Sequence, residues 1–365
     1  MQQQALTERL ITYDTSTSEG LRSAAGFVKG WLEARDIEVH ELLHGDVPVL
    51  TASVGAAEGP TILLHGHLDV VPGFPAQFEP RVEGDRLYGR GAYDMKGGLA
   101  GMMCATRDLA EQSAIRVDFL CVPDEEGEDD SSKSTDRLVA GGCTGDFAIT
   151  GEPTDLRIGV QAKGVLMMSL EVCGTAAHGA RPWLGDNAVL KAIDVFRRIE
   201  SMPFARESSE LFDRPSINLG RISGGDAVNK VPDTCVIDVD VRFLPGQDPE
   251  EILVAVEEIP DVIVRKTFRR RPAVVDASNP FVRTLATAVA DGLPTERISV
   301  GRDGASDAIS FLDAGVPAVE FGPTGGGHHG PQEWVSIASL ARYRFALVEF
   351  VDLLAGRRDQ HLRIA

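Results

Sequence analysis

The stretch LLHGHLDVVP at residues 63–72 joins an apolar run to two histidines and an aspartate. The run from Thr61 to Leu64 is short and apolar, which is typical of a buried strand in a parallel sheet. Polar side chains at the end of such a strand need partners, because burying them unpaired costs free energy. The stretch therefore indicates either a hydrogen-bonded turn or a metal site.

The composition is that of an ordinary globular protein, and its 365 residues are enough for two domains. A formal net charge of −19 disfavours nucleic acid or an anionic membrane as the main partner. The five cysteines are scattered and lack CxxC spacing, which favours a reducing compartment. The first twenty residues lack the apolar segment of a secretory signal, and no run approaches the ~18 apolar residues of a membrane span. We therefore expect a cytoplasmic protein.

The hydrophobic pattern alternates strands and helices at both ends of the chain. Before residue 151, apolar strands are expected at 61–64, 117–122 and 147–150. The alternation of strands and helices resumes after Pro272, with a strand at 318–321 and a last helix near 337–354. Strands that alternate with helices predict an α/β fold, with helices around a mostly parallel sheet.

The middle of the chain has a different pattern. Its expected elements follow the order β-α-β-β-α-β, which is the ferredoxin-like plan. One of its strands, 234–244, alternates apolar and polar residues, which is typical of a half-buried sheet. We therefore expect one α/β domain formed by residues 1–162 and 273–365, with a smaller α+β domain inserted at 163–272.

Chemically active residues follow the predicted parallel strands. The segments are HGHLD after Leu64, PDEEGE after Val122, GEPT after Thr150 and GPTGGGHHG after Phe321. A further segment, GRGAYDMKGG, places Asp94 just before a helix. Each segment alone favours a structural role, such as a turn, a solvated surface or a helix N-cap. Ligands bind outside the carboxyl ends of parallel strands, so the convergence of all the segments favours a metal site.

The spacing within two segments adds to this interpretation. His67 and Asp69 are two residues apart, so in an extended chain they point the same way. A metal-binding imidazole commonly donates its other N–H to a carboxylate, a role that suits Asp69. The adjacent side chains of Glu125 and Glu126 diverge, so one can bind metal while the other is a general base.

Several segments, in order from near residue 60 to near residue 335, together resemble the M20 metallopeptidase family. They are HGHLDVVP, GRGAYDMKGG, PDEEG, GEPT, GGDAVNKVP, DVDVRFLP and HHGPQEW. That family includes acetylornithine deacetylases, succinyl-diaminopimelate desuccinylases, aminoacylases and glutamate-releasing carboxypeptidases. The resemblance implies a dizinc-peptidase-like catalytic domain and an insert that is both a lid and a homodimer interface.

The resemblance also implies a set of site residues. Two divalent ions would be bound by His67, Asp94, Glu126, Glu152 and His329. Asp94 would bridge the ions, and Glu125 would be the general base. The family places a glutamate four residues after its late histidine, so Glu333 favours His329 over His328, although both stay open. Nitrogen and oxygen ligands without thiolate suit zinc, with cobalt or manganese as alternatives.

Three residues of the insert match family positions that contact the substrate. His178 would reach the partner subunit's active site and donate a hydrogen bond to the carbonyl oxygen. Asn229 and Arg242 would hold the substrate. On the residues alone, His178 is interpreted as a surface histidine, and Arg242 as a salt-bridge partner of a nearby aspartate.

The reaction implied is hydrolysis of an N-acyl amino acid by a metal-bound hydroxide, of the deacetylase or desuccinylase type. The alternative is a metallo-carboxypeptidase or dipeptidase acting on a short peptide. A serine hydrolase based on Ser306 is weaker, because Ala308 stands where a nucleophile elbow has glycine. A binding protein that lost catalysis should lack ligands or the base, yet all these positions are filled.

Overall fold

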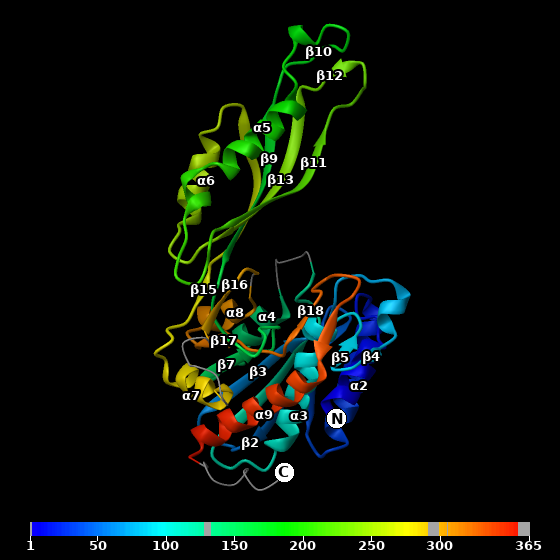
Figure 1. The fold of residues 1–365 in the computed structure, drawn as a ribbon, viewed down its shortest axis with the longest axis vertical. Helices are drawn as coiled ribbons and strands as arrows, with labels where there is room; N and C mark the ends of the chain where they lie inside the picture. The colour runs from blue at the N-terminus through cyan, green and yellow to red at the C-terminus, as the bar shows by residue number, and fades with distance from the viewer. Residues whose placement is uncertain (1, 128–132, 291–298, 305, 357–365) are drawn as a thin grey trace. The chain divides into compact units, whose positions relative to one another are not determined.

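The computed structural model describes residues 2–127, 133–290, 299–304 and 306–356. Two compact units make up the chain. The first comprises Met1–Val160, Val275–Val300 and Asp307–Ala365, and the second comprises Gln161–Val274 and Gly301–Ser306. Figure 1 shows the elements of each unit.

The main sheet has the order β1-β2-β6-β3-β7-β17-β8-β15, with β16 beside β8. Its central strands are parallel: β6 (Arg116–Val122), β3 (Thr61–His67), β7 (Phe147–Thr150) and β17 (Ala318–Glu320). They include every strand whose carboxyl end was predicted to carry site residues. Their apolar side chains are buried because helices cover the sheet, which confirms the predicted α/β class.

The flanks of this sheet are antiparallel, which the hydrophobic pattern did not predict. On one side lie β1 (Val39–His44) and β2 (Val47–Gly55), a hairpin whose second strand pairs with β6. On the other side lie β8 (Ile158–Ala162), antiparallel to β17, and β15 (Ala273–Val274), antiparallel to β8. Strand β16 (Ser299–Arg302) also pairs with β8. The hairpin extends the sheet without a crossover helix, so only its centre keeps the alternating β-α order.

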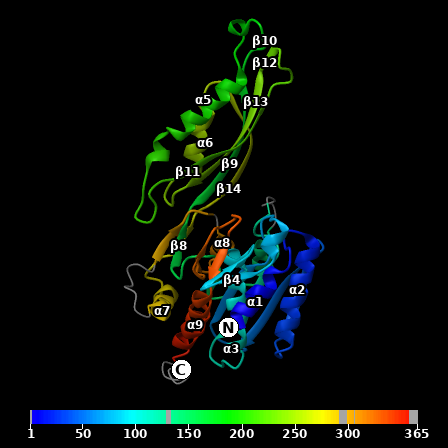
Figure 2. The same ribbon diagram turned by 45° about the vertical axis from the view of Figure 1, so that its right-hand side comes forward.

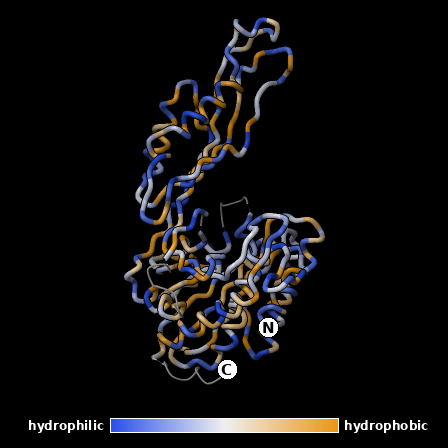
Figure 3. Tube along the Cα trace, in the orientation of Figure 1, coloured by the Kyte–Doolittle hydropathy of each residue, from blue (hydrophilic) through white to orange (hydrophobic). Residues whose placement is uncertain are grey.

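The helices of the first unit are α1 (Gln2–Ile11), α2 (Ser18–Glu33), α3 (Gly97–Asp108), α4 (Ser134–Ala140), α7 (Pro280–Val289), α8 (Ala308–Asp313) and α9 (Ile337–Leu354). Helix α9 packs against α3 and α7, and Figures 1 and 2 both show it beside them. Helices α4 and α8 contact each other elsewhere in the unit. In Figure 3, hydrophobic segments run through the interior of this unit.

Among its described residues, the first unit also contains a small antiparallel sheet and two short helical turns. The sheet contains β4 (Arg81–Glu83), β5 (Arg86–Tyr88), β18 (Gly325–Gly326) and β19 (Trp334–Ser336). The turns are η1 (Pro75–Phe78) and η2 (Ala92–Lys96), and η2 carries Asp94. Among the residues that the structure describes, no helix has the length and hydropathy to cross a membrane.

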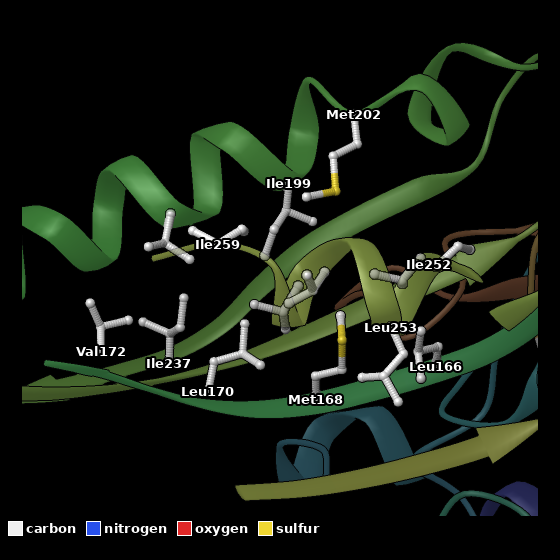
Figure 4. Close-up of a cluster of buried hydrophobic side chains, with 14 of the residues drawn as sticks. Leu166, Met168, Leu170, Val172, Ile199, Met202, Ile237, Ile252, Leu253 and Ile259 are labelled. Atoms are coloured by element: carbon white, nitrogen blue, oxygen red, sulfur yellow. The ribbon is translucent and has the colours of Figure 1, made fainter. Parts of the chain in front are cut away.

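The second unit follows the predicted βαββαβ order and has the strand order β11-β13-β9-β14. Its main elements are β9 (Gly164–Cys173), α5 (Ala188–Glu200), β11 (Ser216–Gly224), β13 (Thr234–Phe243), α6 (Pro249–Glu257) and β14 (Val262–Arg270). Shorter elements are β10 (Ala177–His178), η4 (Pro182–Leu184), η5 (Pro203–Arg206) and β12 (Lys230–Val231). The buried face of the sheet packs against residues of α5 and α6, as Figure 4 shows for Leu170, Ile199 and Ile252.

The contact between α3 and α9 depends on Gly101. A Cβ atom there would lie 2.6 Å from Cδ1 of Tyr343, so any larger residue must displace the buried ring. Gly30, in α2, has nothing within 4 Å of its Cβ position. The two glycines therefore form a matched pair, one in a close contact and one in open space.

We expect Gly101→Ala to lower the free energy of unfolding by roughly 1–2 kcal/mol, because overpacking outweighs the gain in helix propensity. Gly30→Ala should raise it by about 0.5–1 kcal/mol. Urea unfolding curves of both variants measure the difference. Equal shifts of the two midpoints would contradict the packing shown here.

Candidate metal centre

The carboxyl ends of three central strands bring four of the predicted residues, His67, Glu125, Glu126 and Glu152, to one edge of the sheet. Strand β3 ends at His67, and Glu152 follows the end of β7. Glu125 and Glu126 follow the end of β6. Because these strands are parallel and adjacent, their ends meet at the same edge.

His67, Asp94 and Glu152 form one group of potential metal donors, with donor atoms within 4.8 Å of one another. The His67 imidazole is fully buried, and its Nε2 lies 3.1 Å from Oδ1 of Asp94. The same nitrogen lies 3.5 Å from Oε1 of Glu152. One imidazole nitrogen thus faces two carboxylates, which is the arrangement expected around a cation.

Asp94 also belongs to a second group, with His328 and His329. The other oxygen of Asp94, Oδ2, lies 2.5 Å from Nε2 of His328 and 3.3 Å from Nε2 of His329. His329 Nε2 also lies 2.9 Å from Oε1 of Glu126. Both histidines therefore reach Asp94, and His329 links it to Glu126. Glu125 and Glu126 form a third donor group with His67.

The donor set fits divalent cations. Burial raises the pKa of Glu125 and of Glu152 well above the usual value, and Asp94 close by raises both further. Hydrogen bonds to Asp94 and Glu126 raise the pKa of His329 to about 10. The shared cause is negative charge gathered away from water, which bound cations would offset. The contacting atoms are nitrogen and oxygen, the donors that zinc accepts in catalytic sites.

Asp69 has a wider role than the predicted pairing with His67. Nδ1 of His67 lies 3.0 Å from the backbone carbonyl oxygen of Asp69 and 3.5 Å from its Oδ1. The carboxylate accepts hydrogen bonds from the backbone N–H of Glu125, at 3.1 Å, and of Glu126, at 2.7 Å. Asp69 therefore orients His67 and also fixes the turn that carries both glutamates.

A buried ion pair between Arg90 and Glu333 holds the backbone at Asp94. Nη1 of Arg90 lies 2.8 Å from Oε2 of Glu333. Oε1 of Glu333 accepts the backbone N–H of Tyr93, at 3.0 Å, and of Asp94, at 3.1 Å. The HHGPQE spacing singled out Glu333 only as a marker for His329. Arg90 had no signal of its own, since an arginine before a glycine is common in turns.

The same ion pair reaches the late histidines. Nη2 of Arg90 donates to the backbone carbonyl of His329 at 3.2 Å. His329 has a φ of 57°, a left-handed conformation that costs a non-glycine residue roughly 1 kcal/mol. The arginine therefore helps to hold a conformation that the histidine would not prefer alone. One ion pair thus supports Asp94 and His329, which lie far apart in the sequence.

The predicted substrate residues of the insert lie in the second unit. Strands β10 and β12 pair His178 with Lys230, and the Gly179 N–H donates to the carbonyl of Asn229 at 2.7 Å. The structure therefore brings His178 and Asn229 together, and both are exposed. Nδ1 of His178 accepts the N–H of Ala180 at 3.0 Å, so the neutral ring carries its proton on Nε2.

Arg242 lies elsewhere in the second unit, on β13 between β9 and β11. Its Nε lies 3.0 Å from both carboxylate oxygens of Asp240. This is the salt bridge that the sequence offered as the alternative to substrate binding. His65, the other histidine of the opening stretch, is buried, with Nε2 2.9 Å from Oγ1 of Thr135.

Comparison with known proteins gives the family. The family model described as Peptidase family M20/M25/M40 matches residues 63–352. A succinyl-diaminopimelate desuccinylase of Leptothrix cholodnii is 30% identical over 369 residues, which cover 93% of this chain and 94% of the relative. A probable carboxypeptidase of Aspergillus terreus is 36% identical over 206 residues, 54% of this chain and 48% of the relative. The crystal structure of a tripeptidase from Staphylococcus aureus matches with a TM-score of 0.80 and 21% identity, covering 97% of this chain and 98% of the other.

The chain belongs to the M20/M25/M40 family of metallopeptidases, as its motifs predicted. It is a hydrolytic enzyme that acts on amide bonds. The family is a metallopeptidase family, and the donor groups around Asp94 are the candidate metal-binding residues. The alternatives of a serine hydrolase and of a binding protein without catalysis are thereby set aside.

We expect Glu333→Gln to lower the free energy of unfolding by about 3–5 kcal/mol, because it leaves the buried Arg90 guanidinium without its counter-charge. The metal content of the purified protein should fall with it, since Asp94 and His329 lose a shared support. Glu58→Gln, on the exposed surface, is the control and should change stability by less than about 0.5 kcal/mol. A Glu333→Gln protein as stable and as metal-rich as this control would contradict the role of the ion pair.

Proposed function

We propose that the chain is a dimetal hydrolase that removes the acyl group from an N-acyl amino acid, as a deacetylase or desuccinylase does. The position of Asp94 carries the proposal, because its two oxygens face separate groups of nitrogen and oxygen donors. The desuccinylase of Leptothrix cholodnii, which matches nearly end to end, supports the acyl-amino-acid substrate.

In this proposal His67, Asp94 and Glu152 hold one divalent ion. Asp94, Glu126 and His329 hold the other, since Nε2 of His329 lies close to a carboxylate oxygen of each acid. Zinc is the first candidate, with cobalt or manganese as alternatives. Two such ions would polarise the scissile carbonyl and would lower the pKa of the attacking water. Residues 1–162 and 273–365 form the catalytic domain, and residues 163–272 form the lid and homodimer domain.

Glu125 is the proposed general base. It takes a proton from the attacking water on a carboxylate oxygen and delivers it to the nitrogen of the departing amine. The divergence expected from the sequence is not seen, because Glu125 and Glu126 each bring an oxygen within 4.8 Å of the other and of His67. Both carboxylates therefore face the same centre, where Glu126 is the proposed metal ligand and Glu125 the group that faces the water. Asp69 fixes both glutamates by accepting their backbone N–H groups, so the carboxylates are positioned before the substrate binds.

His178 is the proposed donor to the carbonyl oxygen of the substrate, where negative charge develops in the transition state. Its Nδ1 accepts the Ala180 N–H, which leaves the proton of this exposed histidine on Nε2. Asn229 lies beside it and supplies a second polar group. Arg242 would bind the substrate carboxylate, for which the pairing with Asp240 has to be exchanged or shared.

A second candidate is a metallo-carboxypeptidase or dipeptidase, favoured by the match to the probable carboxypeptidase of Aspergillus terreus. Both reactions break an amide bond near a carboxylate, so the metal centre suits either. Hydrolysis of a panel separates them: N-succinyl-diaminopimelate, N-acetylornithine, several N-acetyl amino acids and several dipeptides. Chelator-sensitive turnover of one acyl compound supports the deacylase, whereas turnover of the dipeptides alone would replace it with the second candidate.

We expect Glu125→Gln to lower kcat by about 10²–10⁴-fold, because the proton transfer loses its base. Its metal content should stay near that of the wild type, since Glu125 is not a proposed ligand. Glu126→Gln, the matched variant one residue away, should instead lose metal. Metal analysis and steady-state kinetics on the same samples measure both effects, and an equal loss of metal in the two variants would contradict this division of roles.

We expect His178 to act on the active site of the partner subunit. Mixing His178→Ala protein with Glu125→Gln protein should restore activity, because a mixed dimer then has one complete site. Each variant alone is the control and should stay well below the activity of the mixture. The absence of recovery, after native mass spectrometry has confirmed subunit exchange, would exclude action in trans.

A further inference from the structure

The turn from Asp124 to Gly127 carries both proposed functional glutamates, and its backbone is held on two sides. On one side the Asp69 carboxylate accepts the N–H groups of Glu125 and Glu126. On the other side the ammonium group of Lys133 donates to three carbonyl oxygens of the turn. The acceptors are those of Asp124 at 2.9 Å, Glu125 at 2.6 Å and Gly127 at 2.9 Å.

Lys133 is buried, with 3% of its surface exposed. A buried ammonium group is unfavourable unless polar groups surround it, and its three hydrogens match these three carbonyl oxygens in number. The contacts join the lysine to main-chain atoms, so they set the path of the backbone between Asp124 and Gly127. The same backbone path fixes the Cα positions of Glu125 and Glu126, and therefore where their side chains begin.

The place of Lys133 in the chain argues against an ordinary helix-capping role. It is the N-cap residue of α4, and its side chain makes no capping hydrogen bond. Serine, threonine, aspartate and asparagine are preferred at this position, and a cation there faces the positive end of the helix dipole. A residue that breaks the local preference is expected to serve another purpose, and the turn beside it provides one.

The next residue, Ser134, already ties α4 to the turn. The Asp124 carboxylate accepts its backbone N–H at 2.9 Å and its hydroxyl at 3.0 Å. The start of the helix is therefore anchored to Asp124 without the lysine. What Lys133 adds is the contact with the carbonyl oxygens of Glu125 and Gly127, which lie on either side of Glu126.

We propose that Lys133 is a positioning residue that holds Glu125 and Glu126 in their working geometry. It acts through these residues and touches neither the substrate nor the reacting atoms. The inference rests on the proposed roles of the two glutamates. Misplacement of a reacting group by about 1 Å can lower a rate by about 10²-fold, so a distortion of this turn is expected to affect catalysis more than binding.

The direct test is Lys133→Met, which keeps the length of the side chain and removes the charge and the donors. We expect kcat to fall by about 10–10²-fold and KM to change by less than about twofold. Zinc titration of the metal-free protein should show one weakened binding step, that of the ion held by Glu126, and one unchanged step. An unaltered kcat, or an equal weakening of both steps, would overturn the proposal.

Hydrogen exchange gives a readout that does not depend on activity. In metal-free Lys133→Met, amide exchange should accelerate in the peptide that contains residues 124–127, because the carbonyl contacts that hold this turn are lost. Exchange within α4 should stay near that of the wild type, since Ser134 still anchors the helix. Acceleration confined to α4 would assign Lys133 a role in the helix and would overturn the proposal.

Lys133→Arg is the conservative variant and keeps both the charge and several donors. Lys133→Arg should recover part of the lost kcat and should fold even where Lys133→Met does not. Activity no higher than that of Lys133→Met would count against the contacts with the carbonyl oxygens. Glu125→Gln, which lacks the proposed base, is measured in the same experiment. Wild-type protein that hydrolyses none of the panel would refute the proposed function, while zinc titration and hydrogen exchange would still test Lys133.

Discussion

Several carboxylates are buried close together at one edge of the main sheet, and burying them there costs free energy. The contacts around the candidate metal centre depend on how that cost is offset. Asp94 and Glu152 both lie within 3.5 Å of one imidazole nitrogen of His67, and Glu126 is joined to Asp94 by His329. Such a cluster is stable only when cations or protons offset its charge. The two oxygens of Asp94 face different groups, and the proposal that two cations bind here rests on that position.

Main-chain contacts hold the charged side chains in place. Glu333 accepts the N–H of Asp94, and Asp69 accepts the N–H groups of Glu125 and Glu126. In each case a buried carboxylate binds the backbone and leaves the functional side chain free to face the centre. Supports of this kind fix geometry before the ligand arrives, which lowers the cost of ordering during binding and catalysis.

The fold class, and the meeting of candidate residues at one sheet edge, were predictable from the sequence because both follow simple periodic rules. Apolar runs located the parallel strands, and the residues after them, such as His67 and Glu152, necessarily meet at one edge. The carboxylate contacts of Asp69 and the pair of Arg90 with Glu333 were not predictable. They join segments far apart in the chain, and hydrogen bonds to backbone groups leave no periodic trace. The antiparallel flanks were missed for a related reason, because strand direction depends on the connection rather than on the residues.

The measurement that tests the central claim most directly is the number and position of the metal ions. Crystals of the zinc-loaded protein, with anomalous diffraction at the zinc edge, locate each ion relative to Asp94. The account predicts two ions per chain, roughly 3.5–4 Å apart, with one carboxylate oxygen of Asp94 on each. A single ion, or two ions of which only one touches Asp94, would contradict it.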